Sequence, residues 1–96
     1  MSQIRLSPKA RGDLDAIWDY TAQRWDVDQA EDYLRLLGRT VNLLAASPEL
    51  GGRIDDVRKG YRRFPSASHV IFYRIKPGHI EVIRILHSRM DADRHL

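Results

Sequence analysis

The chain contains no cysteine. This absence excludes disulfide bonds, thiolate nucleophiles and zinc sites with sulfur ligands, and it fits a reducing compartment. No apolar run reaches about 18 residues, and the N-terminus becomes polar at once, without the apolar core of a signal peptide. We therefore expect a soluble cytoplasmic protein that has no membrane partner.

The sequence also lacks the patterns of common cofactor and metal sites. Gly51 and Gly52 are adjacent, but the flanking pattern of a phosphate-binding loop is missing. The histidines lie 8 or 10 positions apart, never at the short intervals of a metal site, and they are His69, His79, His87 and His95. We expect neither a cofactor nor a metal.

The 96 residues suffice for a single domain, residues 1–96, and 43% hydrophobic and 30% charged residues are ordinary values for a folded one. The charge is unevenly distributed along the chain. Residues 57–90 contain eight Lys or Arg residues and one acidic residue, although the whole chain has a net charge of only +3. Such a concentration of positive charge indicates a partner, because it does nothing for folding.

Residues 57–90 also carry the clearest strand signals. Residues 70–73 and 80–86 are β-branched and aromatic runs, and they are joined by a turn with Pro77 and Gly78 at its second and third positions. A type II turn of this kind predicts a β-hairpin. Ile4–Leu6 predicts another strand of the same sheet, with an undetermined partner.

Two amphipathic helices are predicted between these strands. Ser7 is a typical N-cap followed by Pro8, and Asp26 with Gln29 forms a capping box for the second helix, which ends at Ser47 and Pro48. Because the link between the two predicted helices is short, we expect them to form an antiparallel helical hairpin that packs on the sheet. The expected fold is α+β: an N-terminal strand, the helical hairpin, an antiparallel sheet of three to four strands and a short C-terminal tail.

Simple alternation in residues 79–87 places Ile80, Val82, Arg84 and Leu86 on one face and Glu81, Ile83, Ile85 and His87 on the other. Both faces are then partly apolar, and one pair of helices covers only one of them. Two alternatives remain open. A partner chain covers the second face, which we favour, or the N- and C-terminal segments fold over it.

A catalytic site is not favoured. Arg74, Arg84 and His87 could hold a phosphate and supply a general acid for RNA cleavage, but Glu81 is the only carboxylate on these strands and lies about 20 Å from His87. Tyr61, Phe64, Phe72 and Tyr73 are interpreted as core residues rather than as residues that stack on nucleic-acid bases. Trp18 and Trp25 are interpreted as anchors of the apolar stripe of the first helix.

Several motifs, spread over nearly the whole chain, together resemble the ParE toxins of the RelE/ParE superfamily. They are Leu6-Ser7-Pro8, Asp13-Leu14, Ile17-Trp18, Arg24-Trp25, Gln29-Ala30 with Tyr33, Gly60-Tyr61-Arg62, Ser68-His69, Phe72-Tyr73-Arg74, Arg84-Ile85-Leu86-His87 and Met90-Asp91. The resemblance implies the toxin of a bacterial type II toxin–antitoxin module that poisons DNA gyrase and so blocks replication. It also implies a ParD-like antitoxin, a heterotetrameric complex, and contact with operator DNA only through the antitoxin.

Two sets of candidate site residues accompany this resemblance. The candidates for gyrase docking or toxicity are Arg74, Arg84, His87, Arg89 and Met90. The candidates for antitoxin binding are Trp18, Trp25, Tyr33, Leu37, Tyr61, Arg62, Arg63 and Phe64.

The alternative within the superfamily is a ribosome-dependent mRNA endonuclease of the RelE or YoeB type. His87 falls where some of those enzymes have a catalytic His, but Ser88 follows where a Tyr is expected. We therefore expect a protein that is not an enzyme. A third hypothesis is a basic sheet whose main task is binding nucleic acid, with an affinity that falls steeply with salt.

Overall fold

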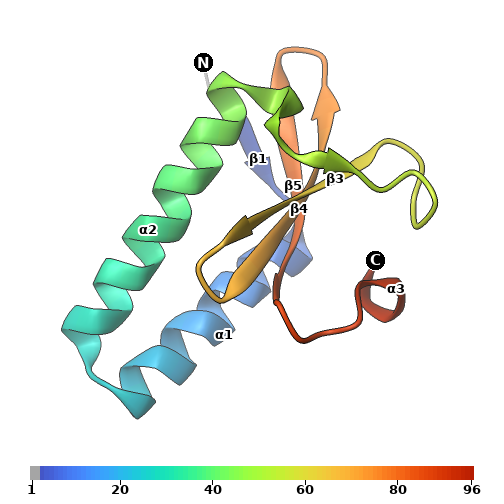
Figure 1. The fold of residues 1–96 in the computed structure, drawn as a ribbon. Coiled ribbons are helices and arrows are strands. Elements are labelled where there is room, and N and C mark those ends of the chain that lie inside the picture. The colour runs from blue at the N-terminus through green and yellow to red at the C-terminus, as the bar shows by residue number, and fades with distance from the viewer. Residues whose placement is uncertain (1–2) are drawn as a thin grey trace.

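The computed structural model describes residues 3–96 and has two long helices on one side of a five-stranded sheet (Figure 1). In chain order the elements are β1 (Ile4–Leu6), α1 (Pro8–Arg24), α2 (Val27–Ala46), the 3-10 helix η1 (Pro48–Leu50), β2 (Gly52–Arg53), β3 (Tyr61–Ser66), β4 (His69–Lys76), β5 (His79–His87) and α3 (Ala92–His95). The strand order is β1-β5-β4-β3-β2. The expected α+β fold is confirmed: β2 to β5 form an antiparallel sheet of four strands, and the N-terminal strand β1 adds a fifth at one edge.

The partner of the N-terminal strand, which the sequence left undetermined, is β5, and β1 runs parallel to it at one edge of the sheet. Ile4 is paired with Ile80 and Leu6 with Val82. The Ile80 N–H donates to the Gln3 carbonyl and the Ser7 N–H to the Val82 carbonyl, both over 2.9 Å. A pairing between the first and last strands of the chain closes a long loop, so no local pattern indicates its direction.

The helix boundaries follow the predicted caps. The Ser7 hydroxyl accepts a hydrogen bond from the Ala10 N–H over 3.0 Å, and Asp26 Oδ1 accepts one from the Gln29 N–H over 2.8 Å. The second helix ends before Ser47, as expected. Because only two residues separate α1 from α2, the helices form a hairpin whose inner side faces the sheet (Figure 1).

A β-bulge in β5 changes which face its second half presents. Tyr73 pairs with Val82 and Phe72 with Arg84, so Ile83 is an extra residue without a partner on β4. Ile80, Val82 and Ile85 all belong to the core beneath the helices. The simple alternation expected for residues 79–87 is therefore wrong after Val82, because one extra residue shifts the later side chains to the opposite face.

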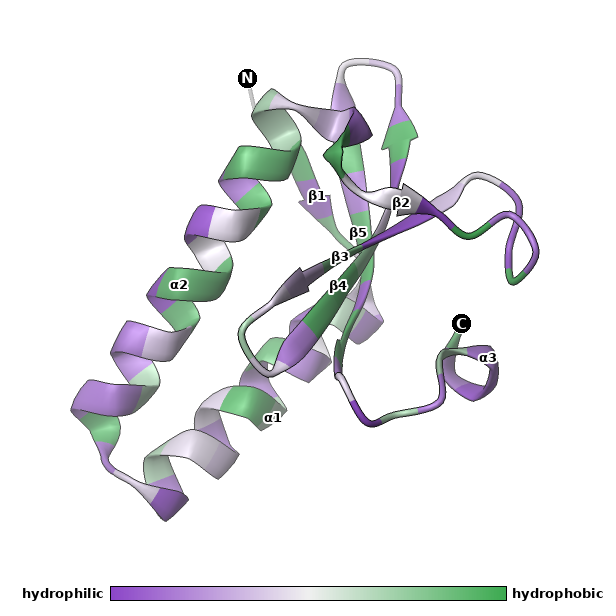
Figure 2. Ribbon diagram, in the orientation of Figure 1, coloured by the Kyte–Doolittle hydropathy of each residue, from purple (hydrophilic) through white to green (hydrophobic). Residues whose placement is uncertain are grey.

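The second face of the sheet is covered by the chain itself. Val70, Phe72 and Leu86 form a separate apolar cluster, and Ala92 and Leu96 of the C-terminal segment pack on it together with Ile54. Figure 2 shows the hydrophobic residues of β4 between the long helices and α3. The favoured expectation, a partner chain over this cluster, is corrected: the C-terminal segment covers it, whereas the N-terminal strand joins the sheet edge.

The loop before β2 is held by Tyr73, whose side chain is fully buried. Its hydroxyl donates to the Pro48 carbonyl over 2.6 Å and accepts from the Gly51 N–H over 2.8 Å. A β-carbon at Gly51 would lie 2.7 Å from Cε1 of the Tyr73 ring and closer still to its hydroxyl. Position 51 is therefore a glycine because the tyrosine ring fills the space of a side chain.

Candidate functional site: the groove between α1 and the end of β5

The edge of β5 is uncovered where β1 ends, and side chains of α1 replace the missing strand. β1 pairs only with residues 80–82. Beyond them the Ser7 hydroxyl donates to the Ile83 carbonyl over 2.6 Å, and the Ile85 N–H donates to Asp13 Oδ2 over 2.9 Å. These two contacts hold α1 against β5 and leave the rest of the strand edge facing a groove.

Arg84 links this edge to the C-terminus. Its Nε and Nη2 each donate to the Asp13 carboxylate over 2.8 Å, and its Nη1 donates to the His95 carbonyl over 3.1 Å. Both charged side chains are largely buried, with 16% and 13% of their surface exposed. The hydrogen bonds to Asp13 raise the pKa of Arg84 above its ordinary value. One arginine therefore joins α1, β5 and the last turn of the chain.

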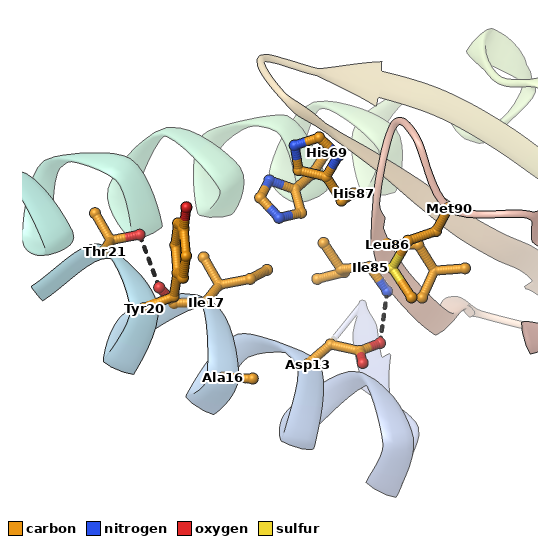
Figure 3. A pocket seen from close by; sticks show the side chains of 10 residues that line it. All are labelled: Asp13, Ala16, Ile17, Tyr20, Thr21, His69, Ile85, Leu86, His87 and Met90. Atoms are coloured by element: carbon orange, nitrogen blue, oxygen red, sulfur yellow. Dashed lines mark hydrogen bonds between the residues drawn. The ribbon is translucent and has the colours of Figure 1, made fainter. Parts of the chain in front are cut away.

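The groove contains an apolar cavity of about 350 Å³, which we call the α1–β5 cavity. Its lining residues are Asp13, Ala16, Ile17, Tyr20, Thr21, His69, Ile85, Leu86, His87 and Met90. Figure 3 shows Ile17 and Tyr20 of α1 on one side and Ile85, Leu86 and Met90 on the other. Asp13 is its only carboxylate, and its oxygens are already occupied by Arg84 and the Ile85 N–H.

His69 and His87 lie side by side at the end of this groove. Their ring centroids are 5.4 Å apart in an edge-to-face arrangement, and the Tyr33 hydroxyl lies 2.6 Å from His69 Nδ1. Burial lowers the pKa of His69, the nearby His87 lowers it further, and Asp13 acts in the opposite direction. The Tyr33 hydroxyl also accepts from the Ser68 N–H, so its proton is free to be donated to a neutral His69.

A second cavity of about 310 Å³ adjoins the first and shares Tyr20, Thr21, His69 and His87 with it. We call it the Trp25 cavity, and its remaining lining residues are Arg24, Trp25, Gln29, Tyr33 and Ser68. Trp25 is 61% exposed. The interpretation of Trp25 as an anchor of the first helix is therefore wrong, because α1 ends at Arg24 and the tryptophan turns outward at the junction with α2.

The gyrase-docking candidates occupy three different environments. Three of them, His87, Arg89 and Met90, are exposed and lie within four residues of one another at and just after the end of β5. Arg84 is committed to Asp13. Arg74 lies on the opposite face of the sheet, where its Nε donates to Glu81 over 2.7 Å and its guanidinium is 5.9 Å from the centre of the Tyr61 ring. The structure thus brings only three of the five candidates together.

The antitoxin-binding candidates do not form one patch. Leu37 is 1% exposed and belongs to the main core, against which Tyr33 and Phe64 also pack. Arg62 donates to the Gly51 carbonyl over 2.8 Å, whereas Arg63 is exposed and has no ion pair within residues 3–96. Trp18 and Tyr61 are partly buried, and Trp25 is exposed. Leu37 in particular offers no accessible side chain in the folded protein.

The basic residues of the strand segment do not form one continuous surface. Arg58 donates to the Leu96 carbonyl over 2.8 Å, and Arg62, Arg74 and Arg84 have the internal partners described above. Within the part of the chain that the structure describes, the exposed basic residues of this segment with neither an ion pair nor a side-chain hydrogen bond are Lys59, Arg63, Lys76 and Arg89.

The bulge also separates the residues of the catalytic hypothesis. Glu81 faces Arg74 and Tyr61 on the side away from the long helices, whereas His87 contacts His69 on the helix side. The expectation that Glu81 and His87 share a face is therefore wrong. Among residues 3–96, no group of three or more His, Cys, Asp or Glu side chains is placed to hold a metal ion.

Comparison with known proteins shows the family. The family described as "ParE toxin of type II toxin-antitoxin system, parDE" matches residues 4–92. The chain is 49% identical to Toxin ParE1 of Mycobacterium tuberculosis strain H37Rv over 96 residues, which cover 99% of this chain and 98% of the relative. It is 48% identical to Toxin ParE1 of Caulobacter vibrioides, with 100% and 99% covered. The chain belongs to the ParE toxin family of type II toxin–antitoxin systems.

A solved structure titled "Chromosomal ParDE TA system from P. aeruginosa" has the same fold as this ParE-family chain. The TM-score is 0.77 over 91% of this chain and 96% of that chain, and the sequence identity is 24%. The ParE resemblance stated from the motifs is thus confirmed. Within residues 3–96, neither long helix has an apolar stretch of the length that a membrane span requires.

Of the residues that line the groove, only His87 and Met90 were candidate site residues from the sequence, and Asp13 and Tyr20 are the most informative of those that were missed. Asp13 appears there only within a motif of the family resemblance, without a role of its own, and Tyr20 does not appear at all. Asp13 binds an arginine 71 positions away, so its role had no local signal. Tyr20, 65% exposed, had one available signal: it is a large aromatic residue outside the apolar stripe of its helix.

Proposed function

We propose that this ParE-family toxin inhibits DNA gyrase and thereby blocks replication, and that a ParD-like antitoxin neutralises it. The observation that carries the proposal is the family match over residues 4–92, together with near 49% identity to proteins named Toxin ParE1. The proposed setting is the cytoplasm. The proposed complex with the antitoxin is a heterotetramer that contacts operator DNA through the antitoxin only.

Within this proposal, the end of β5 is the surface that contacts gyrase. His87, Arg89 and Met90 are exposed next to one another and next to the α1–β5 cavity, and Met90 is 42% exposed. Arg89 has no ion pair within residues 3–96, so its charge is available to a partner. Arg74 and Arg84, by contrast, are already paired with carboxylates.

The same contacts support a toxin that is not an enzyme. A nuclease of the kind considered above needs an arginine free to hold a phosphate and a carboxylate near the histidine. Arg84 is bound by Asp13 through two hydrogen bonds, Arg74 is bound by Glu81, and Glu81 lies across the sheet from His87. These contacts favour inhibition by binding over RNA cleavage.

The decisive experiment compares two targets. The purified protein is added to gyrase, ATP and plasmid DNA, and in parallel to ribosomes translating a defined messenger RNA. We expect lost supercoiling or gyrase-dependent DNA breaks, with the RNA intact. Cut RNA with unaffected gyrase would overturn both the proposed target and the non-enzymatic mechanism.

A pair of variants locates the surface. We expect the double substitution of Arg89 and Met90 by alanine to weaken gyrase inhibition while leaving antitoxin binding, measured by calorimetry, unchanged. Substitution of Lys59 by alanine is the control for charge, because it removes one exposed positive charge, as the double variant does, at a position outside the groove. Equal loss of inhibition in both variants would point to net charge instead of this surface.

A further inference from the structure

The Trp25 cavity has two strongly exposed aromatic side chains. Trp25 is 61% and Tyr20 65% exposed, and both line the same cavity at the end of α1. Aromatic rings left open to solvent at one place are available for stacking, and nucleic-acid bases stack on such rings with little regard to sequence. Neither ring is needed by the core, since neither belongs to either buried cluster or to the residues packed against them.

The cavity is also basic. Arg24, His69 and His87 line it, and no carboxylate does. The Arg24 guanidinium lies over the Trp25 ring, 5.8 Å from its centre, so a positive charge stands at one face of the aromatic ring. An anionic group bound here would lie beside the permanently charged Arg24 guanidinium and beside two imidazole rings, of which His69 has a lowered pKa.

Hydrogen-bonding groups complete the lining. The side-chain amide of Gln29 has no hydrogen bond within residues 3–96, since only its backbone N–H is used, by Asp26. An amide that can both donate and accept is suited to the edge of a base. The volume of about 310 Å³ lies at the lower end of small-molecule sites and is far too small for a double helix.

We propose that the Trp25 cavity binds one unpaired nucleotide of a single-stranded nucleic acid. The base stacks on Trp25 or Tyr20, and its phosphate lies beside Arg24 and the two histidines. This site shares His87 with the exposed end of β5 that we assign to gyrase, whereas Trp25, Tyr20 and Arg24 lie outside that surface. It goes beyond the proposed inhibition of gyrase and does not depend on it.

The test measures fluorescence anisotropy of a fluorescein-labelled ten-nucleotide thymidine oligomer with the full-length protein. A duplex of the same length and an acidic peptide of alternating glutamate and leucine serve as competitors. The variants are Trp25→Ala and Arg24→Gln. Their matched controls are Leu43→Ala, which removes an apolar side chain that is 47% exposed on α2, and Arg39→Gln, which removes an exposed arginine of α2.

We expect the single strand to bind more tightly than the duplex, and each cavity variant to weaken binding about tenfold while the controls change it less than twofold. Circular dichroism verifies that the four variants are folded. Equal losses in Arg24→Gln and Arg39→Gln, or preference for the duplex, would reveal unspecific attraction and overturn the proposal. No binding at low salt would overturn it too. Displacement by the acidic peptide at lower concentration would assign the cavity to a protein segment instead.

Discussion

Asp13 and Arg84 lie 71 positions apart and form a paired, largely buried contact in which two guanidinium nitrogens donate to the two carboxylate oxygens over 2.8 Å each. Asp13 also accepts from the Ile85 N–H, and Arg84 also reaches the His95 carbonyl. This one pair therefore holds the first helix, the last strand and the C-terminal turn in register, and it forms one end of the groove.

Breaking this pair should destabilise the whole domain. We expect Asp13→Ala to lower the free energy of unfolding by about 3 kcal/mol, because it leaves a largely buried guanidinium and a backbone N–H without their acceptor. Urea denaturation measures the effect. Glu81→Ala is the control, since the Arg74–Glu81 pair has 39% and 27% of its side-chain surface exposed and should cost at most about 1 kcal/mol. Equal losses would show that Asp13 acts only as a surface charge.

Gly51 should tolerate no side chain. We expect Gly51→Ala to cost about 1–3 kcal/mol, because the new methyl group would overlap the buried Tyr73 ring and disturb its bonds to Pro48 and Gly51. Thermal denaturation compares this variant with Gly52→Ala, whose β-carbon would meet nothing within 4 Å. If both variants melt at the wild-type temperature, the loop moves aside and the close approach has no energetic consequence.

His69 should make stability depend on pH. Its pKa in the folded protein is lowered from 6.5, so the unfolded chain takes up its proton first as the pH falls. The stability that a neutral His69 gives the folded protein is therefore fully present above about pH 6.5, and it is lost as the pH falls from there through the lowered pKa of the folded state. We therefore expect the wild-type protein to lose more stability between pH 7.5 and pH 5.5 than His69→Gln does.

Chemical denaturation at the two pH values measures that difference. His79→Gln is the control, because His79 lies at the β4–β5 turn, away from Tyr33, His87 and Asp13, which surround His69. Between pH 7.5 and pH 5.5, the His79→Gln variant should lose as much stability as the wild-type protein does. An identical pH dependence in His69→Gln and the wild-type protein would contradict the assignment.

The C-terminal segment should protect the second apolar cluster. We expect removal of residues 91–96 to lower the free energy of unfolding by about 1–2 kcal/mol and to increase binding of a hydrophobic dye, because Ala92 and Leu96 no longer pack on the second apolar cluster. Arg94→Ala is the control, since that side chain is 84% exposed. An unchanged unfolding curve and unchanged dye fluorescence in the truncated protein would show that the segment adds no protection.

The sequence by itself determined the elements whose causes are local. Caps such as Ser7 and Asp26 accept from amide groups three residues away, and the period of apolar residues marks the buried side of each helix. Both helices and the β4–β5 hairpin were therefore predicted. The motifs along the chain were enough to indicate the family. They did not indicate which of the candidate residues lie together.

Only the tertiary structure decided the features that depend on distant partners. The bulge at Ile83 arises from pairing with β4, and it moves Glu81 and His87 to opposite faces of the sheet. The parallel pairing of β1 with β5, the ion pair of Arg84 with Asp13 and the packing of Leu96 on the second apolar cluster each join segments far apart in the chain. Such contacts form because other surfaces are already in place, and neither residue type nor spacing encodes them locally.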